Sequence, residues 1–294
     1  NSGNKGARPD VDTYSILINA WAKSSDVDAP QQARNILNTM ISSYSNGALD
    51  EAPTTITYSS VMDTYAAQGD VEGASDIFGM MEDDFSCGNK DARPDVDTYS
   101  ILINAWAKSS DVDAPQQARN ILNTMISSYS NGALEPDMRT YSTLINAWAK
   151  SGIVDSPTEA EKILKKMIDR HSKGELKQRP NIVAYNSVMD AYANKGEVEG
   201  ANRVLEMMRS DSKNVRPDMI SYSTLIKAWA KSNKKEAREE VENVLQEMNN
   251  LHKSGYLKEG PDALTYSSII ECLQKFKGTK NRIQELQALL NAVQ

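Results

Sequence analysis

The sequence is short of the side chains that catalysis and disulfide bonding need. Its 294 residues include two cysteines, Cys87 and Cys272, and two histidines, His171 and His252. Cysteines 185 positions apart, with no Cys-x-x-Cys pair, argue against a disulfide framework or a zinc module and fit a reducing compartment. Nucleophilic catalysis needs a base beside its nucleophile. The sequence shows no such pattern, so we assign no catalytic residue and expect that the chain is not an enzyme.

Long apolar runs and phosphate-binding loops are missing as well. No apolar run approaches the roughly 18 residues of a membrane-spanning helix, which predicts no membrane association. There is no Gly-rich phosphate loop, and no cluster of Asp, His and Cys has the spacing of metal ligands. The sequence therefore predicts no cofactor and no metal site.

Acidic residues outnumber basic ones, but only in the first half of the chain. The net charge is −7. Residues 1–135 carry 8 basic and 19 acidic side chains, whereas residues 136–294 carry 25 basic and 21 acidic ones. Nucleic-acid affinity comes largely from neutralising phosphates. An acidic average is therefore awkward for a nucleic-acid binder, and the first half is the more acidic one.

What the chain has in abundance is repetition. Residues 7–49 recur without a substitution as residues 92–134, an identity over 43 positions. A looser form of the unit continues to the end of the chain, and each copy opens on Thr-Tyr-Ser or a close variant, at Tyr14, Tyr58, Tyr99, Tyr141, Tyr185, Tyr222 and Tyr266. Such repetition predicts an array in which each unit packs mainly on its neighbours.

Each unit is predicted to form two helices. Apolar residues at helical spacing line one face of the opening segment, in the first unit Tyr14, Leu17, Ile18 and Trp21. We expect Asp12 or Thr13 to cap the start of this helix. A second amphipathic helix follows Pro30, and Gly69 and Gly196 are expected to end the first helices of two later units. One hairpin cannot bury both apolar faces, so the units must stack.

The sequence thus predicts an all-α fold, a right-handed α-solenoid of tandem helix–turn–helix repeats that forms a single domain over residues 1–294. Residues 1–10 align with the end of the second unit and are interpreted as the tail of a repeat upstream. The repeats are placed at about 11–54, 55–95, 96–137, 138–181, 182–218, 219–262 and 263–294.

Three features recur together in these units: the Thr-Tyr-Ser or Tyr-Asn opening, an apolar pair such as Leu17-Ile18, and a Pro-Asp close. This combination resembles the pentatricopeptide repeat family across the whole chain, although the units are longer than the roughly 35 residues usual for the family. The resemblance implies that the partner is single-stranded RNA, with one base read per repeat by two or three side chains. We also expect a monomer, with room for protein partners.

The resemblance implies which side chains would read each base. They are the residue after the Tyr and the residue that closes the unit after its Pro. The pairs are Ser15 with Thr54, Ser59 with Asp95, Ser100 with Asp137, Ser142 with Asn181, Asn186 with Asp218, and Ser223 with Asp262, while Ser267 has no closing partner. The ordinary alternative is that these small polar residues start and cap helices.

The chemistry of the pairs suggests a target sequence. A carboxylate only accepts hydrogen bonds, so Asp suits the ring N–H of G or U, whereas an Asn amide can donate to the bare ring nitrogen of A. In the family, a hydroxyl after the Tyr goes with purines and an Asn there goes with pyrimidines. Repeats two to six would then read GGAUG, 5′ to 3′ along the chain. The first pair, Ser15 with Thr54, is assigned no base.

Two further slots have implied roles. A lysine at the end of the first helix is implied to contact phosphate, although compensation of the helix dipole explains it equally well; these residues are Lys23, Lys108, Lys150, Lys231 and Lys275. The slot before the Thr is implied to stack on the base, and it holds Ile56, Val183, Ile220, Leu264 and Arg139. Asp12 and Asp97 depart from that pattern and would place a carboxylate beside a base.

Three functional hypotheses remain open at this point. The first is non-catalytic, sequence-specific binding of single-stranded RNA in organellar RNA processing, stability or translation, with a mitochondrial or plastid location implied by the family. The second is a protein-interaction scaffold, favoured by the acidic composition. The third is the specificity arm of an RNA-processing enzyme whose catalytic domain lies outside this sequence.

Overall fold

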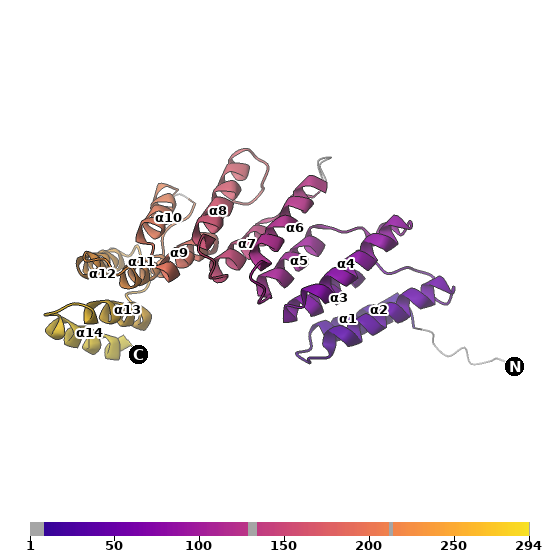
Figure 1. The fold of residues 1–294 in the computed structure, drawn as a ribbon, viewed down its shortest axis with the longest axis horizontal. Coiled ribbons are helices and arrows are strands. Elements are labelled where there is room, and N and C mark those ends of the chain that lie inside the picture. Colours follow the sequence, from indigo (N-terminus) through magenta and orange to yellow (C-terminus); the bar gives the residue numbers. More distant parts are fainter. Residues whose placement is uncertain (1–8, 129–133, 212–213, 294) are drawn as a thin grey trace. The chain divides into compact units, whose positions relative to one another are not determined.

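The structure is a computed structural model that describes residues 9–128, 134–211 and 214–293. Within these ranges all regular secondary structure is helical (Figure 1). The helices are α1 (Val11–Ala22), α2 (Ala29–Ser45), α3 (Thr55–Gln68), α4 (Val71–Ser86), η1 (Lys90–Ala92), α5 (Val96–Lys108), α6 (Ala114–Ser128), α7 (Met138–Lys150), α8 (Ser156–Ser172), α9 (Ile182–Lys195), α10 (Val198–Ser210), α11 (Met219–Lys231), α12 (Ala237–Lys253), α13 (Ala263–Gln274) and α14 (Lys280–Val293). The expected all-α solenoid of tandem hairpins is confirmed. Most of the expected upstream tail, residues 1–8, lies outside the described residues.

The chain forms two compact units, Asn1–Ala147 and Trp148–Gln294. We call them unit one and unit two. Unit one carries 9 basic and 20 acidic residues, a net charge of −11, and unit two carries 24 basic and 20 acidic residues, a net charge of +4. The charge asymmetry of the sequence therefore follows the division of the structure.

The same packing order recurs in both units. In unit one α1, α3 and α5 pack on one another in sequence, and α2 and α4 each pack on their own first helix and on that of the next repeat. In unit two α9, α11 and α13 form the corresponding row, with α10 and α12 placed in the same way. Each repeat therefore buries the apolar faces of its neighbours, as expected for a solenoid.

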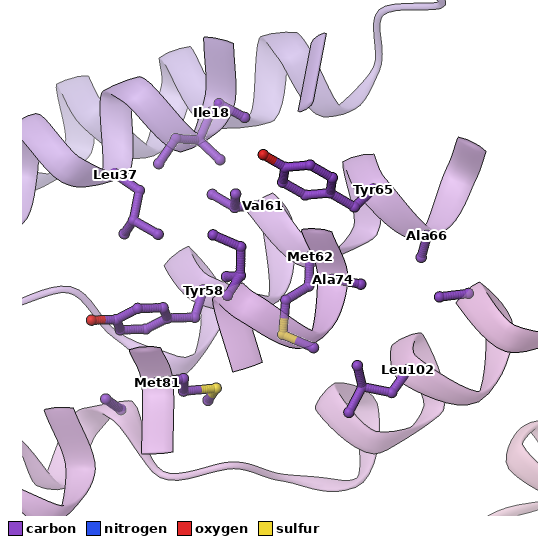
Figure 2. Close-up of a cluster of buried hydrophobic side chains, with 14 residues drawn as sticks. Ile18, Leu37, Tyr58, Val61, Met62, Tyr65, Ala66, Ala74, Met81 and Leu102 are labelled. Carbon is purple, nitrogen blue, oxygen red and sulfur yellow. The ribbon is translucent and has the colours of Figure 1, made fainter. Parts of the chain in front are cut away.

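The core of unit one is built from the apolar faces that the sequence indicated (Figure 2). Ile18 and Leu37 of the first repeat meet Val61 of the second, and all three are fully buried. Leu17 is the exception, since it is 46% exposed although the equivalent Val61 is buried. Val61 is covered by the repeat before it, and no repeat precedes α1 among the described residues.

The start of α1 corrects one prediction. Its N-cap is Asp10, whose Oδ1 accepts a 2.9 Å hydrogen bond from the Thr13 N–H, so neither Asp12 nor Thr13 is the cap. Asp10 has the extended backbone that a cap needs, whereas Asp12 already lies in the first helical turn. The residue that closes one repeat thus begins the next helix.

The predicted glycine helix ends are confirmed at Gly69 and Gly196, with φ values of 72° and 70°. Both positions also lie against the next repeat. A Cβ on Gly69 would come within 2.9 Å of the Lys108 carbonyl oxygen, and one on Gly196 within 2.7 Å of the Lys231 carbonyl oxygen. Only glycine allows both the left-handed turn and this close approach.

Candidate RNA interface

The closing acid of each repeat has a structural role. The Oδ1 atom of Asp95 caps α5 by accepting hydrogen bonds from the N–H and the hydroxyl of Thr98, at 2.9 and 2.8 Å. The same double acceptance joins Asp137 to Thr140, Asp218 to Ser221 and Asp262 to Thr265. The ordinary reading of these acids as helix caps is therefore correct. In each of these caps it is Oδ1 that accepts, so the second carboxylate oxygen takes no part in the cap.

The capping hydroxyl joins the two members of a predicted base-reading pair. In unit one the Ser100 and Thr140 hydroxyls are 2.6 Å apart, and Thr140 in turn donates to Asp137 at 2.8 Å. Ser59 and Asp95 are joined through Thr98 in the same manner, with a longer 3.3 Å contact between the two hydroxyls. In both pairs one threonine hydroxyl thus links the residue after the Tyr to the closing acid.

Unit two repeats this arrangement with one variation. Ser223 lies 2.7 Å from the Thr265 hydroxyl, which donates to Asp262 at 2.6 Å. In the preceding pair Asn186 reaches the acid directly, because its amide nitrogen donates to Asp218 Oδ1 at 3.1 Å. Four of the six predicted pairs are thus brought together by hydrogen bonds.

The remaining positions are arranged differently. No bridge of this kind is found among the described residues between Ser15 and Thr54, whose repeat lacks a closing acid. Ser142 and Asn181 belong to different units, and Asn181 caps α9 by accepting from the Ala184 N–H. The unpaired Ser267 donates to the Ala263 carbonyl within its own helix.

Apolar side chains stand exposed at the predicted stacking slot. The exposed fraction runs from 56% to 73% for Val183, Ile220, Leu264 and Ile56. Arg139, Asp12 and Asp97, which occupy the same slot in other repeats, are exposed as well. Exposed apolar side chains therefore recur at this position in four of the repeats.

A groove in unit one collects several of these groups. Its volume is ≈ 360 Å³, and α3, α5 and α7 contribute its lining. Among the lining residues are the stacking candidates Ile56, Asp97 and Arg139 and the base-reading candidates Ser59, Asp95 and Ser100. Residues chosen from separate repeats of the sequence therefore face one hollow, which we call the unit-one groove.

The lysines have a structural role in at least two repeats. The Lys108 ammonium donates to the Ala67 carbonyl at 3.4 Å, and that of Lys275 donates to the Ala230 carbonyl at 2.6 Å. Both carbonyls belong to the last turn of the preceding repeat's first helix, where a cation offsets the helix dipole. Lys23, Lys150 and Lys231 are exposed near the ends of α1, α7 and α11.

Sequence reasoning missed the residue that joins each pair. Hydroxyl side chains hold that slot in six of seven units, at Thr13, Thr57, Thr98, Thr140, Ser221 and Thr265. The signal was present, because the hydroxyl stands three residues after the closing acid, which is the spacing of a capping box. The sequence motif treats this hydroxyl residue only as the first residue of Thr-Tyr-Ser and does not indicate that it links the two members of a pair.

The described residues offer no sign of other chemistry. They contain no group of three or more His, Cys, Asp or Glu side chains that could hold a metal ion. None of their helices combines the length and apolar character needed to cross a membrane. His171 and His252 lie at matching positions in the last turns of α8 and α12, where the Nδ1 atoms are 2.8 and 3.2 Å from the backbone carbonyl oxygens of Leu176 and Leu257.

Comparison with known proteins gives matches to repeats and to solved folds. The profile described as the PPR repeat family matches residues 53–108 and 180–231, and that of the PPR repeat matches residues 139–172. A search of the curated proteins found no match.

Among solved structures, the pentatricopeptide repeat protein PPR10 in complex with an 18-nt psaJ RNA element is 22% identical, with a TM-score of 0.52. The match covers 100% of this chain and 41% of PPR10, so this chain spans less than half the length of that protein. The PPR domain of Arabidopsis thaliana protein-only RNase P 1 in complex with tRNA is 16% identical, with a TM-score of 0.44, and the match covers 77% of this chain and 95% of that one. The repeat profiles, the fold shared with PPR10 and the capped, Tyr-opened hairpins agree: the chain belongs to the pentatricopeptide repeat family.

Proposed function

We propose that this chain binds single-stranded RNA sequence-specifically, with each joined pair of hydroxyl or amide and carboxylate contacting one base. One observation carries the proposal. The same constellation, a polar residue after the Tyr held to a closing acid, recurs at four places. PPR10, which shares the fold, has been solved with an RNA element.

The geometry suits base reading for two reasons. The capping bonds fix each acid through Oδ1, which leaves Oδ2 outside the cap to accept from the ring N–H of G or U. Exposed apolar residues beside the pairs offer surfaces on which bases stack, a contact worth about 1–3 kcal/mol per base. The target we propose for repeats two to six is GGAUG.

In this proposal the chain acts without catalysis of its own. It would occlude, stabilise or mark a transcript in mitochondria or plastids, where most of the family works. If the protein extends beyond this sequence, the array could equally serve as the specificity arm of a processing enzyme. A monomer suffices, because the four joined pairs are each made within one chain.

A protein-interaction scaffold is the second candidate, and the charge of unit one favours it. A net charge of −11 opposes binding to phosphates over that half of the chain. The salt dependence of binding distinguishes RNA binding from a protein-interaction scaffold. RNA binding that neutralises several phosphates must weaken steeply as salt rises.

Fluorescence anisotropy with a labelled 12-nucleotide RNA that contains GGAUG tests the proposal against a scramble of the same composition. We expect tighter binding to GGAUG and a loss of that preference in Ser223→Ala. Ser267→Ala is the matched control, since Ser267 has the same place in its repeat and no closing partner. Equal affinity for both RNAs would contradict the proposal.

A further inference from the structure

The two units differ at the exposed slot two residues before the opening Tyr of each repeat. In unit two three successive repeats place apolar side chains there, Val183, Ile220 and Leu264. In unit one the slot is not uniformly apolar, since it holds Asp12, Ile56, Asp97 and Arg139. An exposed apolar side chain beside hydrogen-bonding groups can hold the flat face of a base, whereas a carboxylate is hydrated and offers no such surface.

The unit-one groove shows the effect of this difference. Its acidic lining residues are Asp63, Asp95 and Asp97, and its only basic lining residue is Arg139. Asp95 is fixed in the groove by the two hydrogen bonds from Thr98. An RNA strand placed here would bring its phosphates close to three carboxylates, and like charges at such range repel.

The charge of each whole unit acts in the same direction. Unit one has a net charge of −11 and unit two of +4, so the wider field also directs a polyanion to unit two. Unit one nevertheless has joined pairs at Ser59 and Ser100, and these would read bases if a strand could approach them. Both units therefore contain two joined pairs, and they differ in net charge and in the acids at the slot before the opening Thr-Tyr.

Resting on the RNA binding proposed above, we infer that Asp12 and Asp97 exclude RNA from unit one and confine base-specific binding to unit two. The protein then discriminates between bases at two positions of GGAUG. These are the U, read by Asn186 with Asp218, and the final G, read by Ser223 with Asp262. The first two G positions, assigned to the pairs of Ser59 and Ser100, contribute no discrimination in the natural chain.

A base-substitution scan of the GGAUG 12-mer tests this inference. Replacing the U or the final G should weaken binding about tenfold, the effect of losing one good hydrogen-bonded contact. Replacing either of the first two G bases should change the affinity less than twofold. Equal sensitivity at all four positions overturns the inference and leaves the proposed function intact. No sensitivity at any position means that the proposed function itself has failed.

The acid slots are tested by substitution. The double variant Asp12→Val and Asp97→Val should bind more tightly and become sensitive to the first two G bases. The control Glu51→Gln and Glu72→Gln removes the same two charges at exposed positions outside the groove, and it should leave the scan unchanged. If the control gains the same sensitivity, net charge alone is responsible and the inference fails. If the Val variant gains none while its circular-dichroism melting curve is unchanged, the acids do not exclude RNA.

Discussion

An ion pair ties consecutive second helices in both units, but its polarity is reversed. In unit one Arg34 of α2 donates to Asp76 of α4 at 3.2 Å. In unit two the acid comes first, since Glu161 of α8 accepts from Arg203 of α10 at 3.0 and 2.7 Å. Arg34 and Glu161 hold equivalent places, each directly after a fully buried alanine of its helix.

The two pairs also differ in their surroundings. Glu161 is 5% exposed and gathers further bonds from Lys165 and from the Tyr192 hydroxyl. In unit one it is the acid that is open to solvent, since Asp76 is 54% exposed, whereas the two arginines show the opposite order, with Arg34 29% and Arg203 51% exposed. The equivalent hydroxyl in unit one, that of Tyr65, is buried beside the Arg34 guanidinium and has no acceptor for its own proton. An arginine side chain has no acceptor atom for such a hydroxyl, whereas a glutamate does.

The comparison shows which charges can join the second helices of successive repeats. The contact requires opposite charges on successive second helices but not a particular order of them. The order of the two charges then decides whether the neighbouring tyrosine hydroxyl has a hydrogen-bond acceptor. The burial of the acid decides how much the pair contributes to the free energy of unfolding.

Glu161→Ala should have the largest effect, a loss of about 3 kcal/mol in the free energy of unfolding, because it leaves Arg203 and the Tyr192 hydroxyl without their acceptor. Arg34→Ala should cost less than about 1 kcal/mol, as solvent-exposed pairs do. Urea unfolding followed by circular dichroism measures both. Similar losses for the two variants would mean that burial does not separate the pairs.

Acid should weaken unit two through the same glutamate. Burial acts to raise the pKa of Glu161, but hydrogen bonds from Arg203, Lys165 and Tyr192 outweigh it and lower the pKa to about 2. A lowered pKa stabilises the fold above the unfolded value of 4.5, and this contribution is lost as the pH falls from 4.5 towards 2. Melting curves across this range should show the loss in the natural chain and a smaller one in Glu161→Gln. Parallel pH profiles would contradict the assignment.

Gly73→Ala and Gly200→Ala should destabilise the two units alike, by about 2 kcal/mol each from overpacking. A Cβ at either position would lie 2.1 Å from a ring atom, of Tyr65 in one unit and of Tyr192 in the other. Gly79→Ala is the control, because it has open space in the same helix as Gly73. It should stabilise by roughly 0.5–1 kcal/mol through helix propensity. Thermal unfolding measures these changes in stability. An unchanged melting temperature in Gly73→Ala would refute the packing argument.

Reversing the unit-one pair should have the smallest effect. Arg34→Glu alone places two acids together and should cost about 1 kcal/mol or less, the range of exposed charge pairs. Adding Asp76→Arg should restore that loss and gain about 1 kcal/mol more by giving the Tyr65 hydroxyl an acceptor. A double-mutant cycle, measured by urea unfolding, gives the coupling energy between residues 34 and 76. No recovery in the double variant would mean that polarity is not interchangeable.

Local features of the fold were predictable from the sequence, and contacts between distant residues were not. The helices follow from apolar spacing, and the glycine ends at Gly69 and Gly196 follow from one residue's conformational freedom. The pairing of Ser100 with Asp137 was implied by the family resemblance, which fixes both places from the repeat motif. The partner of Glu161 was not, because Arg203 lies 42 residues away and no local pattern links them. The buried state of Leu17 was predicted wrongly because burial there depends on a preceding repeat.

The most direct test asks whether a closing acid reads a base or only caps a helix. Asparagine caps helices as well as aspartate does, so Asp218→Asn should keep its melting temperature. The new amide donates where the carboxylate accepted, which suits the bare ring nitrogen of C in place of the ring N–H of U. We predict that anisotropy titrations with GGAUG and GGACG will show a preference for U in the natural chain and for C in the variant. An unchanged preference for U, with unchanged stability, would contradict the account.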